Sequence, residues 1–265
     1  MLIKEFFGAL DYVAPINLSY KCIEKGSYDN SGILINSTGE VNRVLFSLDL
    51  SKKAIELAKK LKCDTIVTHH PAIYAPVKSL DINGQNSEVL LAVKNGLNVI
   101  SMHLNLDVCK TGIDFYLGVA IANGEQEILD KFSNDEGYGR VTRLFANFDC
   151  LIKNLKKNLK TNKILVYGNR RNLNKLNQIK IASFCGAGGS DLLNALNQKG
   201  KEIDLFISSD LPHHVIKEVV EMEKGLVIIP HYASENYGFN KYFELIKSSL
   251  CDKIHAYYFE DKRFL

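Results

Sequence analysis

Apolar residues along this chain follow two spacings that alternate with each other. Residues 43–50 ("RVLFSLDL") form a short apolar run, which is typical of a buried strand. Residues 51–62 then place apolar side chains at helical spacing, and Ser51 is a suitable N-cap residue. The alternation continues with a strand at 64–70, a helix at 87–96 that ends at Gly96, and a strand at 97–103. This β-α-β-α-β order predicts a parallel, right-handed α/β layer.

The second half of the chain repeats this plan. Its predicted elements are a strand, a Gly-rich turn and a helix within 180–200, a strand within 203–214, a helix at 214–225 and a strand at 226–231. The segments "KNGLNVISMHLNLD" and "EKGLVIIPHYASE" match in order, and the distance from His103 to His231 equals that from Asp107 to Glu235, at 128 residues. We therefore expect an internal duplication: two similar α/β lobes at 1–128 and 129–265, joined near 123–148, where turn-forming and charged residues are frequent.

Histidines and carboxylates gather where the predicted strands end. Adjacent histidines follow one strand, and the spacing His-x-x-x-carboxylate follows two others. The carboxyl ends of parallel strands meet at one edge of a sheet, and imidazole and carboxylate groups are ligands for divalent metals. We therefore predict one composite metal site in the cleft between the two lobes. Its proposed residues are His69, His70, His103, Asp107, His231 and Glu235.

Three histidines of this set have more than one interpretation. Neighbouring side chains of an extended strand point to opposite sides. His69 and His70 can therefore serve one metal site only if the strand ends before them, which Pro71 favours; otherwise they are surface histidines. His103 is either a metal ligand or a group that orients Asp107 or water.

Other polar positions have a structural and a functional interpretation. His213 and His214 are predicted to start a helix, with proton transfer or substrate contact as the alternative. Asp210 is interpreted as the cap of that helix rather than as a residue facing the site. The segment "GAGG" (186–189) is either a tight turn or a phosphate cradle. The lysines and arginines of 150–190, a stretch without acidic residues, are expected mainly on the solvent face of a helix, with a face that attracts an anion or nucleotide as the alternative.

Composition limits the class of protein. The chain has 265 residues, 46% of them hydrophobic, and its 33 Lys+Arg against 30 Asp+Glu give a net charge of +3. This charge gives no reason to expect a nucleic-acid or membrane partner, and no stretch approaches the roughly 18 apolar residues of a membrane span. The six cysteines are scattered without a C-x-x-C pair, and the N-terminus lacks the apolar core of a signal peptide. We expect reduced thiols and a cytoplasmic location.

Taken together and in this order, the motifs resemble the NIF-three-like family, also catalogued as type-2 homologues of GTP cyclohydrolase I. The resemblance covers nearly the whole chain. It implies a two-lobe α/β subunit with a dinuclear metal centre, in which His69 and His70 bind different ions of a pair. It also implies a homo-oligomeric ring, commonly of six subunits. The matching segments are "YDNSGILI" (28–35), "THHPAIY" (68–74), "HLNLD" (103–107), "GYGRV" (137–141), "CGAGGSDLL" (185–193), "ISSDLPHH" (207–214) and "HYASE" (231–235).

This sequence departs from the family pattern at three positions. Tyr28 stands where Trp is common, Leu104 where Thr is usual, and Ser209 where Gly is expected. The six proposed metal-site residues keep the expected types. The departures therefore concern the substrate more than metal binding.

The ligand types indicate hydrolytic chemistry. Mixed imidazole and carboxylate ligands suit two divalent ions of zinc, manganese or iron, and a pair of ions about 3.5–4 Å apart activates water at neutral pH. The resemblance implies a small-molecule substrate such as GTP, whose imidazole ring would be opened at C8 with release of formate. His103 or a residue of 210–214 would then move protons. The alternatives are another two-metal hydrolase, acting on phosphoesters or cyclic amides, and a non-catalytic metal-binding or interaction protein.

Overall fold

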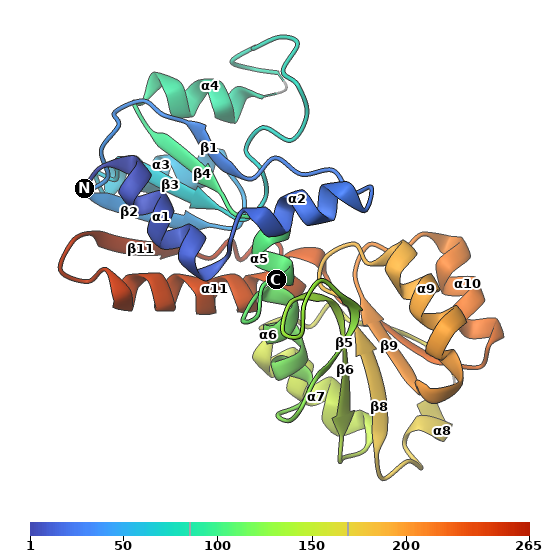
Figure 1. Cartoon of the computed structure of the whole chain (residues 1–265). Coiled ribbons are helices and arrows are strands. Elements are labelled where there is room, and N and C mark those ends of the chain that lie inside the picture. The colour runs from blue at the N-terminus through green and yellow to red at the C-terminus, as the bar shows by residue number, and fades with distance from the viewer. Residues whose placement is uncertain (85, 169) are drawn as a thin grey trace. The chain divides into compact units, whose positions relative to one another are not determined.

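The computed structural model describes residues 1–84, 86–168 and 170–265 (Figure 1). The chain forms two compact units, each built around a β-sheet. The first unit contains Met1–Cys109 and Phe239–Glu260, and the second contains Lys110–Gly238 and Asp261–Leu265. Helix α11 (His231–Ser249) therefore begins in the second unit and ends in the first.

The sheet of the first unit has the order β1-β4-β3-β2-β11 within the described residues. The pairs β2–β3, β3–β4 and β2–β11 are parallel, and β1 runs antiparallel to β4. The prediction that the strands at 43–50, 64–70 and 97–103 are parallel is confirmed, since these are β2, β3 and β4. The elements of this unit, apart from α11, are α1 (Ile3–Val13), α2 (Asn17–Glu24), β1 (Gly32–Ile35), β2 (Arg43–Ser47), α3 (Lys52–Lys60), β3 (Thr65–Thr68), α4 (Ser87–Lys94), β4 (Asn98–Ser101), α5 (Leu104–Val108) and β11 (His255–Phe259).

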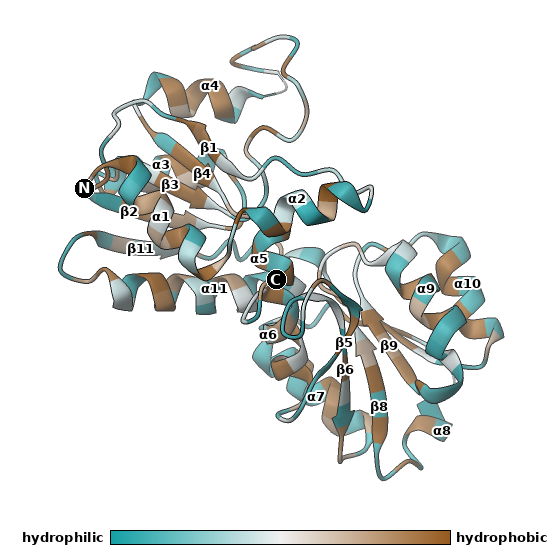
Figure 2. Ribbon diagram, in the orientation of Figure 1, coloured by the Kyte–Doolittle hydropathy of each residue, from teal (hydrophilic) through white to brown (hydrophobic). Residues whose placement is uncertain are grey.

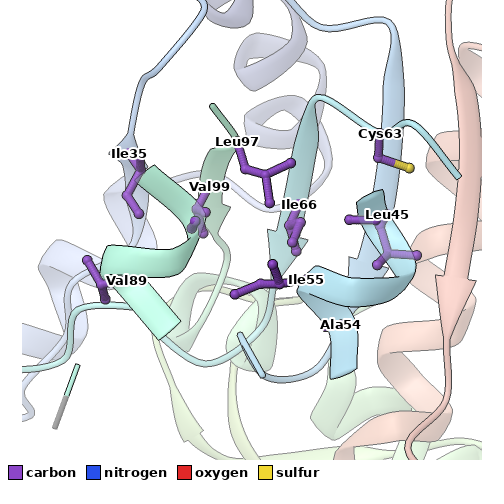
Figure 3. Close-up of a cluster of buried hydrophobic side chains, with 11 residues drawn as sticks. Ile35, Leu45, Ala54, Ile55, Cys63, Ile66, Val89, Leu97 and Val99 are labelled. Atoms are coloured by element: carbon purple, nitrogen blue, oxygen red, sulfur yellow. The ribbon is translucent and has the colours of Figure 1, made fainter. Parts of the chain in front are cut away.

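Helices cover both faces of this sheet because successive strand residues point to opposite sides. Leu45 of β2 packs in a buried cluster beneath α3 and α4, where Ile55 contributes from α3 (Figure 3). The next residue, Phe46, faces the other way, and its ring centroid lies 5.3 Å from that of Phe243 on α11. The predicted N-cap of α3 is confirmed, since Ser51 Oγ accepts a hydrogen bond from the backbone N–H of Ala54 at 3.1 Å.

The sheet of the second unit has the order β5-β6-β8-β9-β10-β7 among the described residues. Strands β8, β9 and β10 are parallel neighbours, while β5–β6, β6–β8 and β7–β10 are antiparallel pairs. The elements are α6 (Ile113–Ile121), β5 (Glu127–Lys131), β6 (Gly137–Leu144), α7 (Phe148–Asn158), β7 (Leu165–Tyr167), α8 (Arg170–Leu173), β8 (Ile179–Ser183), α9 (Gly189–Lys199), the 3-10 helix η1 (Gly200–Glu202), β9 (Leu205–Ser208), α10 (His213–Glu221) and β10 (Gly225–Ile228).

Helices α9 and α10 bury their apolar faces against one side of this sheet. Leu192 and Val219, one from each helix, pack with Phe206 of β9 in a buried cluster. Figure 2 shows the division, with hydrophobic strands and helices that carry both hydrophobic and hydrophilic positions. Helix α6 packs against strands β6 and β8. Among the described residues, no helix combines the length and apolarity that a membrane crossing requires.

The two sheets share a strand order. In the first unit, β1 is antiparallel to β4, which continues in parallel to β3 and β2; in the second, β7 is antiparallel to β10, which continues in parallel to β9 and β8. The connecting helices also correspond, because α3 and α4 take the chain positions of α9 and α10. This agreement supports the predicted duplication, which remains an inference from topology. The units differ at the next position, where parallel β11 joins β2 and antiparallel β6 joins β8.

Two segments differ from the sequence-based expectation. Residues 123–148 were expected to join two lobes, but they contain β5 and β6, which pair with each other and continue the second sheet through β8. A boundary at residue 128 would cut β5. Near the C-terminus, β11 pairs with β2 of the first unit, although 129–265 was expected to form the second lobe. In both cases the segment joins a sheet through a partner that is distant in sequence, β8 for β6 and β2 for β11, rather than by local spacing.

A buried ion pair links α6 to β6 in the second unit. Arg140 Nε donates to Asp114 Oδ2 at 3.2 Å, and the backbone N–H of Cys185 donates to Asp114 Oδ1 at 3.2 Å. Burial raises the pKa of Asp114 from 3.8 to about 6, against the opposing effect of Arg140. The carboxylate thus fixes the segment that follows β8.

This pKa predicts a pH-dependent contribution to stability. Because the folded pKa lies above the ordinary value, the folded state binds the Asp114 proton more tightly than the unfolded chain does. The contribution is therefore fully present below about pH 4 and falls by up to roughly 3 kcal/mol as the pH rises through about 6. The unfolding free energy of the wild type minus that of Asp114→Asn, measured by urea denaturation, should fall over this range, because the asparagine does not titrate. A value that rises with pH would contradict the assignment.

Candidate metal centre

The adjacent histidines lie just beyond the end of a strand. Strand β3 ends at Thr68, and the backbone N–H groups of His69 and His70 both donate to the carbonyl oxygen of Leu48, at 3.1 and 3.0 Å. The chain has therefore left the extended conformation before the pair, as Pro71 led us to expect. His69 is fully buried and His70 is partly exposed.

The first unit brings four of the predicted residues together. Ring nitrogens of His69, His70 and His103 lie within 4.8 Å of one another. His69 Nε2 lies 3.5 Å from Asp107 Oδ1. His103 is the N-cap residue of α5, and its carbonyl oxygen accepts the backbone N–H of Asp107 at 3.0 Å.

The second unit places the other two residues on the first turn of α11. His231 is the first residue of this helix, and its Nε2 lies 3.0 Å from Glu235 Oε1. The spacing His-x-x-x-carboxylate was expected in loops that follow strands, but in both units it coincides with the start of a helix. Residues four apart lie on one face of a helix, which explains why this spacing brings an imidazole and a carboxylate together.

Each imidazole of this set has Nδ1 beside an oxygen acceptor. A carbonyl oxygen can only accept, so His69 carries its proton on Nδ1 and presents an Nε2 lone pair when neutral. Carboxylates beside Nδ1 of His70 and His103 favour the same tautomer, an arrangement that recurs around metal-bound histidines. His231 has a carboxylate beside each ring nitrogen, Asp210 at Nδ1 and Glu235 at Nε2. The contacts join His69 Nδ1 to the Met102 carbonyl oxygen (2.8 Å), His70 Nδ1 to Asp49 Oδ1 (2.7 Å), His103 Nδ1 to Asp29 Oδ1 (2.8 Å) and His231 Nδ1 to Asp210 Oδ2 (2.6 Å).

Asp29 is buried in the first unit and stays ionised at neutral pH. Burial raises its pKa, but hydrogen bonds from His103, Ser19 and Ser31 outweigh that effect, so the pKa lies below its ordinary value. Ser31 Oγ donates to Asp29 Oδ2 at 2.8 Å and accepts the backbone N–H of His103 at 3.0 Å. The Asp29 segment therefore holds both the ring and the backbone of His103.

Sequence reasoning did not assign the oxygen acceptors of these imidazoles. The structure corrects the interpretation of Asp210 as a helix cap, since Pro212 is the N-cap residue of α10 and Asp210 contacts His231. Asp49 could have been found, because it follows β2, the parallel neighbour of β3. Asp29 precedes an antiparallel strand, β1, whose first residue pairs with the last residue of β4; local spacing gives no sign of that pairing.

The Gly-rich segment forms a tight turn beside the second donor set. Gly186 has φ +58°, and a Cβ there would lie 2.5 Å from Glu235 Oε1. The backbone N–H of Gly186 donates to Ser234 Oγ at 3.0 Å, and the hydroxyl of Tyr138 donates to the carbonyl oxygen of Cys185. Glycine is thus required both by the backbone conformation and by the closeness of Glu235.

The other histidine pair occupies the structural position that the sequence predicts. His213 and His214 are exposed and open α10, as helix-start residues. Cys109 and Cys185 are buried.

A family model described as Duf34/NIF3 (NGG1p interacting factor 3) matches residues 1–261. The chain belongs to this family. A relative from Methanocaldococcus jannaschii named "GTP cyclohydrolase 1 type 2 homolog" is 28% identical over 254 residues, covering 94% of this chain and 96% of the relative. "NGG1-interacting factor 3" of Saccharomyces cerevisiae is 27% identical, covering 86% of this chain and 85% of its own.

A solved Duf34/NIF3-type structure has the same fold. The Bacillus cereus protein described as related to NIF3 superposes with a TM-score of 0.83 at 15% identity, covering 98% of this chain and 97% of its own. The mixed α/β fold is therefore the fold of this family, and the chain has groups of His, Asp and Glu side chains that could bind metal ions.

Asp49→Asn should weaken metal binding with little effect on the fold. The variant retains the shape of the side chain but loses the charge beside His70 Nδ1, and changes of this kind lower metal affinity by about 10–100-fold. Competition with a chelator measures the zinc affinity. Asp135→Asn, at an exposed surface ion pair with Lys110, is the matched control. Equal affinity in the two variants would argue against a role for Asp49 in metal binding.

Gly186→Ala should disturb the second donor set, whereas Gly39→Ala should not. Both glycines have positive φ, at +58° and +73°, so both substitutions strain the backbone. At Gly39 a Cβ meets nothing within 4 Å, while at Gly186 it meets Glu235. We expect loss of bound zinc, measured by mass spectrometry of metal content, in Gly186→Ala alone. Equal zinc in both variants would show that Glu235 needs no such space.

Proposed function

We propose that this protein binds two divalent metal ions in one centre and hydrolyses a small molecule there. The observation that carries the proposal is the shared arrangement of the four imidazoles, each with Nδ1 held by an oxygen acceptor. Such contacts favour Nε2 as the metal-binding atom. A set of surface histidines would not require matched acceptors or the burial of His69.

The donor types fit a divalent metal. Imidazole nitrogens and carboxylate oxygens suit zinc, manganese or iron and do not select one of them. The proposed ligands are His69, His70, Asp107, His231 and Glu235. His103 either completes this set or moves a proton to and from water, and the metal content of His103→Ala separates these two roles.

Helix α11 contains residues of both units. The helix is continuous from His231 to Ser249, across the division between the units. Phe239 lies in the first unit, with its ring centroid 6.0 Å from that of His69. Glu235 precedes Phe239 by four residues, about one turn on the same helix face. We propose that Glu235 and the group that contains His69 serve the same centre.

Divalent ions in such a centre act as Lewis acids and make water nucleophilic near neutral pH. The chain's own residues prepare this chemistry. Asp29 and Asp49 hold the rings of His103 and His70 and keep their protons on Nδ1. The buried carboxylates of Asp107 and Glu235 balance positive charge where bulk water is largely excluded.

GTP is the substrate that we propose first, because several relatives carry the name "GTP cyclohydrolase 1 type 2 homolog". In this reaction water adds to C8 of the guanine ring, and the C8–N9 bond breaks. A second water then releases C8 as formate and leaves an amine. His103 or a residue of 210–214 is proposed to carry the protons.

Formate release from GTP tests this function. The protein loaded with zinc, manganese or iron should release formate, and Asp107→Ala should lose at least about 100-fold of the rate together with at least one bound ion, because removal of a charged ligand opens the centre. His213→Ala, at an exposed histidine, should leave the metal content unchanged and serves as the control for metal binding.

Other outcomes would redirect the proposal. Two bound ions without formate release would exclude GTP and point to phosphoesters or cyclic amides, which a small substrate panel distinguishes. A centre with no exchangeable water would favour a metal-carrying or interaction protein. Retention of two ions by both Asp107→Ala and Glu235→Ala would refute the ligand assignment.

A further inference from the structure

Two tyrosines lie in contact with each other beside the first donor set. The ring centroids of Tyr28 and Tyr74 are 4.9 Å apart at an interplanar angle of 63°. The Tyr74 ring also meets His103 edge-on, with a centroid distance of 6.5 Å. Despite these contacts Tyr28 is 49% exposed and Tyr74 is 53% exposed. Large aromatic surfaces are thus presented to solvent next to a proposed metal-site residue.

Hydrogen bonds hold the two segments that carry these rings. Asn30 Nδ2 donates to the carbonyl oxygen of Ile73 at 2.6 Å, which ties residues 28–31 to residues 71–74. Ser31 Oγ accepts the backbone N–H of His103 at 3.0 Å and ties the first of these segments to the donor set. The side chains of Asn30 and Ser31 therefore place the segments that carry the tyrosines relative to each other and to His103, and little further ordering of these segments is needed on binding.

We propose that Tyr28 and Tyr74 form a subsite for the planar aromatic or heteroaromatic ring of a small-molecule substrate. This inference rests on the proposed function, since it concerns the same site. Tyrosine rings provide flat, rigid faces on which such rings stack. Two side chains are far too small a surface for a stable protein interface, which needs roughly 800 Å² per partner. Their contact with His103 would bring a stacked ring close to the donor set.

The subsite sorts substrates by one property. A ring-bearing molecule gains stacking on the tyrosines, whereas an ester or phosphate without a ring gains nothing from them. The Tyr hydroxyls are not required for stacking, so phenylalanine should replace tyrosine at either position with little loss. Tyr28 and Tyr74 are therefore specificity-determining residues rather than catalytic residues.

Calorimetric titration of the zinc-loaded protein tests the subsite. The probes are GTP and guanosine, which carry a ring, and inorganic tripolyphosphate, which does not. Tyr28→Ala and Tyr74→Ala should bind the ring-bearing probes about 10-fold more weakly, the size expected from loss of one stacking partner. Binding of tripolyphosphate and the zinc content should stay as in the wild type.

Two control variants separate stacking from structural damage. Tyr74→Phe should bind guanosine nearly as the wild type does, because it keeps the aromatic face. Tyr12→Ala removes a tyrosine that is 89% exposed on α1 and should change nothing. Wild-type affinity for guanosine in both alanine variants would overturn the proposal, as would failure of the wild type to bind any ring-bearing probe.

Metal content and hydrolysis rates of the same variants distinguish this proposal from the proposed function. If the protein binds no metal but binds the ring-bearing probes through the two tyrosines, the subsite is supported and the proposed metal centre is refuted. If the metal-loaded protein hydrolyses ring-free substrates and both alanine variants are as active as the wild type, the proposed function is supported and the subsite is refuted.

Discussion

The register of three parallel strands decides where the first donor set lies. Ser47 of β2 pairs with Thr68 of β3, which pairs with Ser101 of β4, so the three strands end level with one another. The residues just beyond these ends are Asp49, the His69–His70 pair and His103. A change of one residue in register would turn every side chain of a strand to the opposite face. The positions of the donor side chains therefore depend first on the backbone pairing of the sheet.

In the second unit, too, a histidine and a carboxylate lie at the start of a helix that follows a parallel strand, but the oxygen acceptor of the histidine comes from a different kind of segment. Strand β10 pairs in parallel with β9, and His231 begins a helix shortly after β10, as His103 precedes α5 after β4. In both units a carboxylate follows four residues later on the same helix face. The acceptors differ, because Asp29 comes from outside the parallel strands and Asp210 follows β9 directly. Helix geometry supplies the donor pair, and neighbouring segments supply its orientation.

The sequence carried enough local information for the parallel strands, their connecting helices and the positions of the histidines. The Ser51 cap and the helix of residues 51–62 follow from hydrogen-bonding and spacing rules that act within one turn. Strand β11 was not found, since it acquires its structure by pairing with β2, far away in the chain. The β5–β6 hairpin was not found either, since it joins the sheet where β6 pairs with β8. The contact of Asp29 with His103 joins residues 74 positions apart and leaves no local pattern. Long-range pairing is thus the part that sequence spacing does not encode.

The continuity of α11 has a consequence for how the molecule comes apart. No single cut of the backbone separates the two units, because the chain passes from the first to the second after Cys109 and returns within α11. Unfolding either unit removes the packing that supports its portion of that helix. Loss of helical hydrogen bonds would then spread towards the other portion, since helix formation is cooperative along the chain. The units are therefore joined energetically as well as covalently, and the molecule should melt as one body rather than as two.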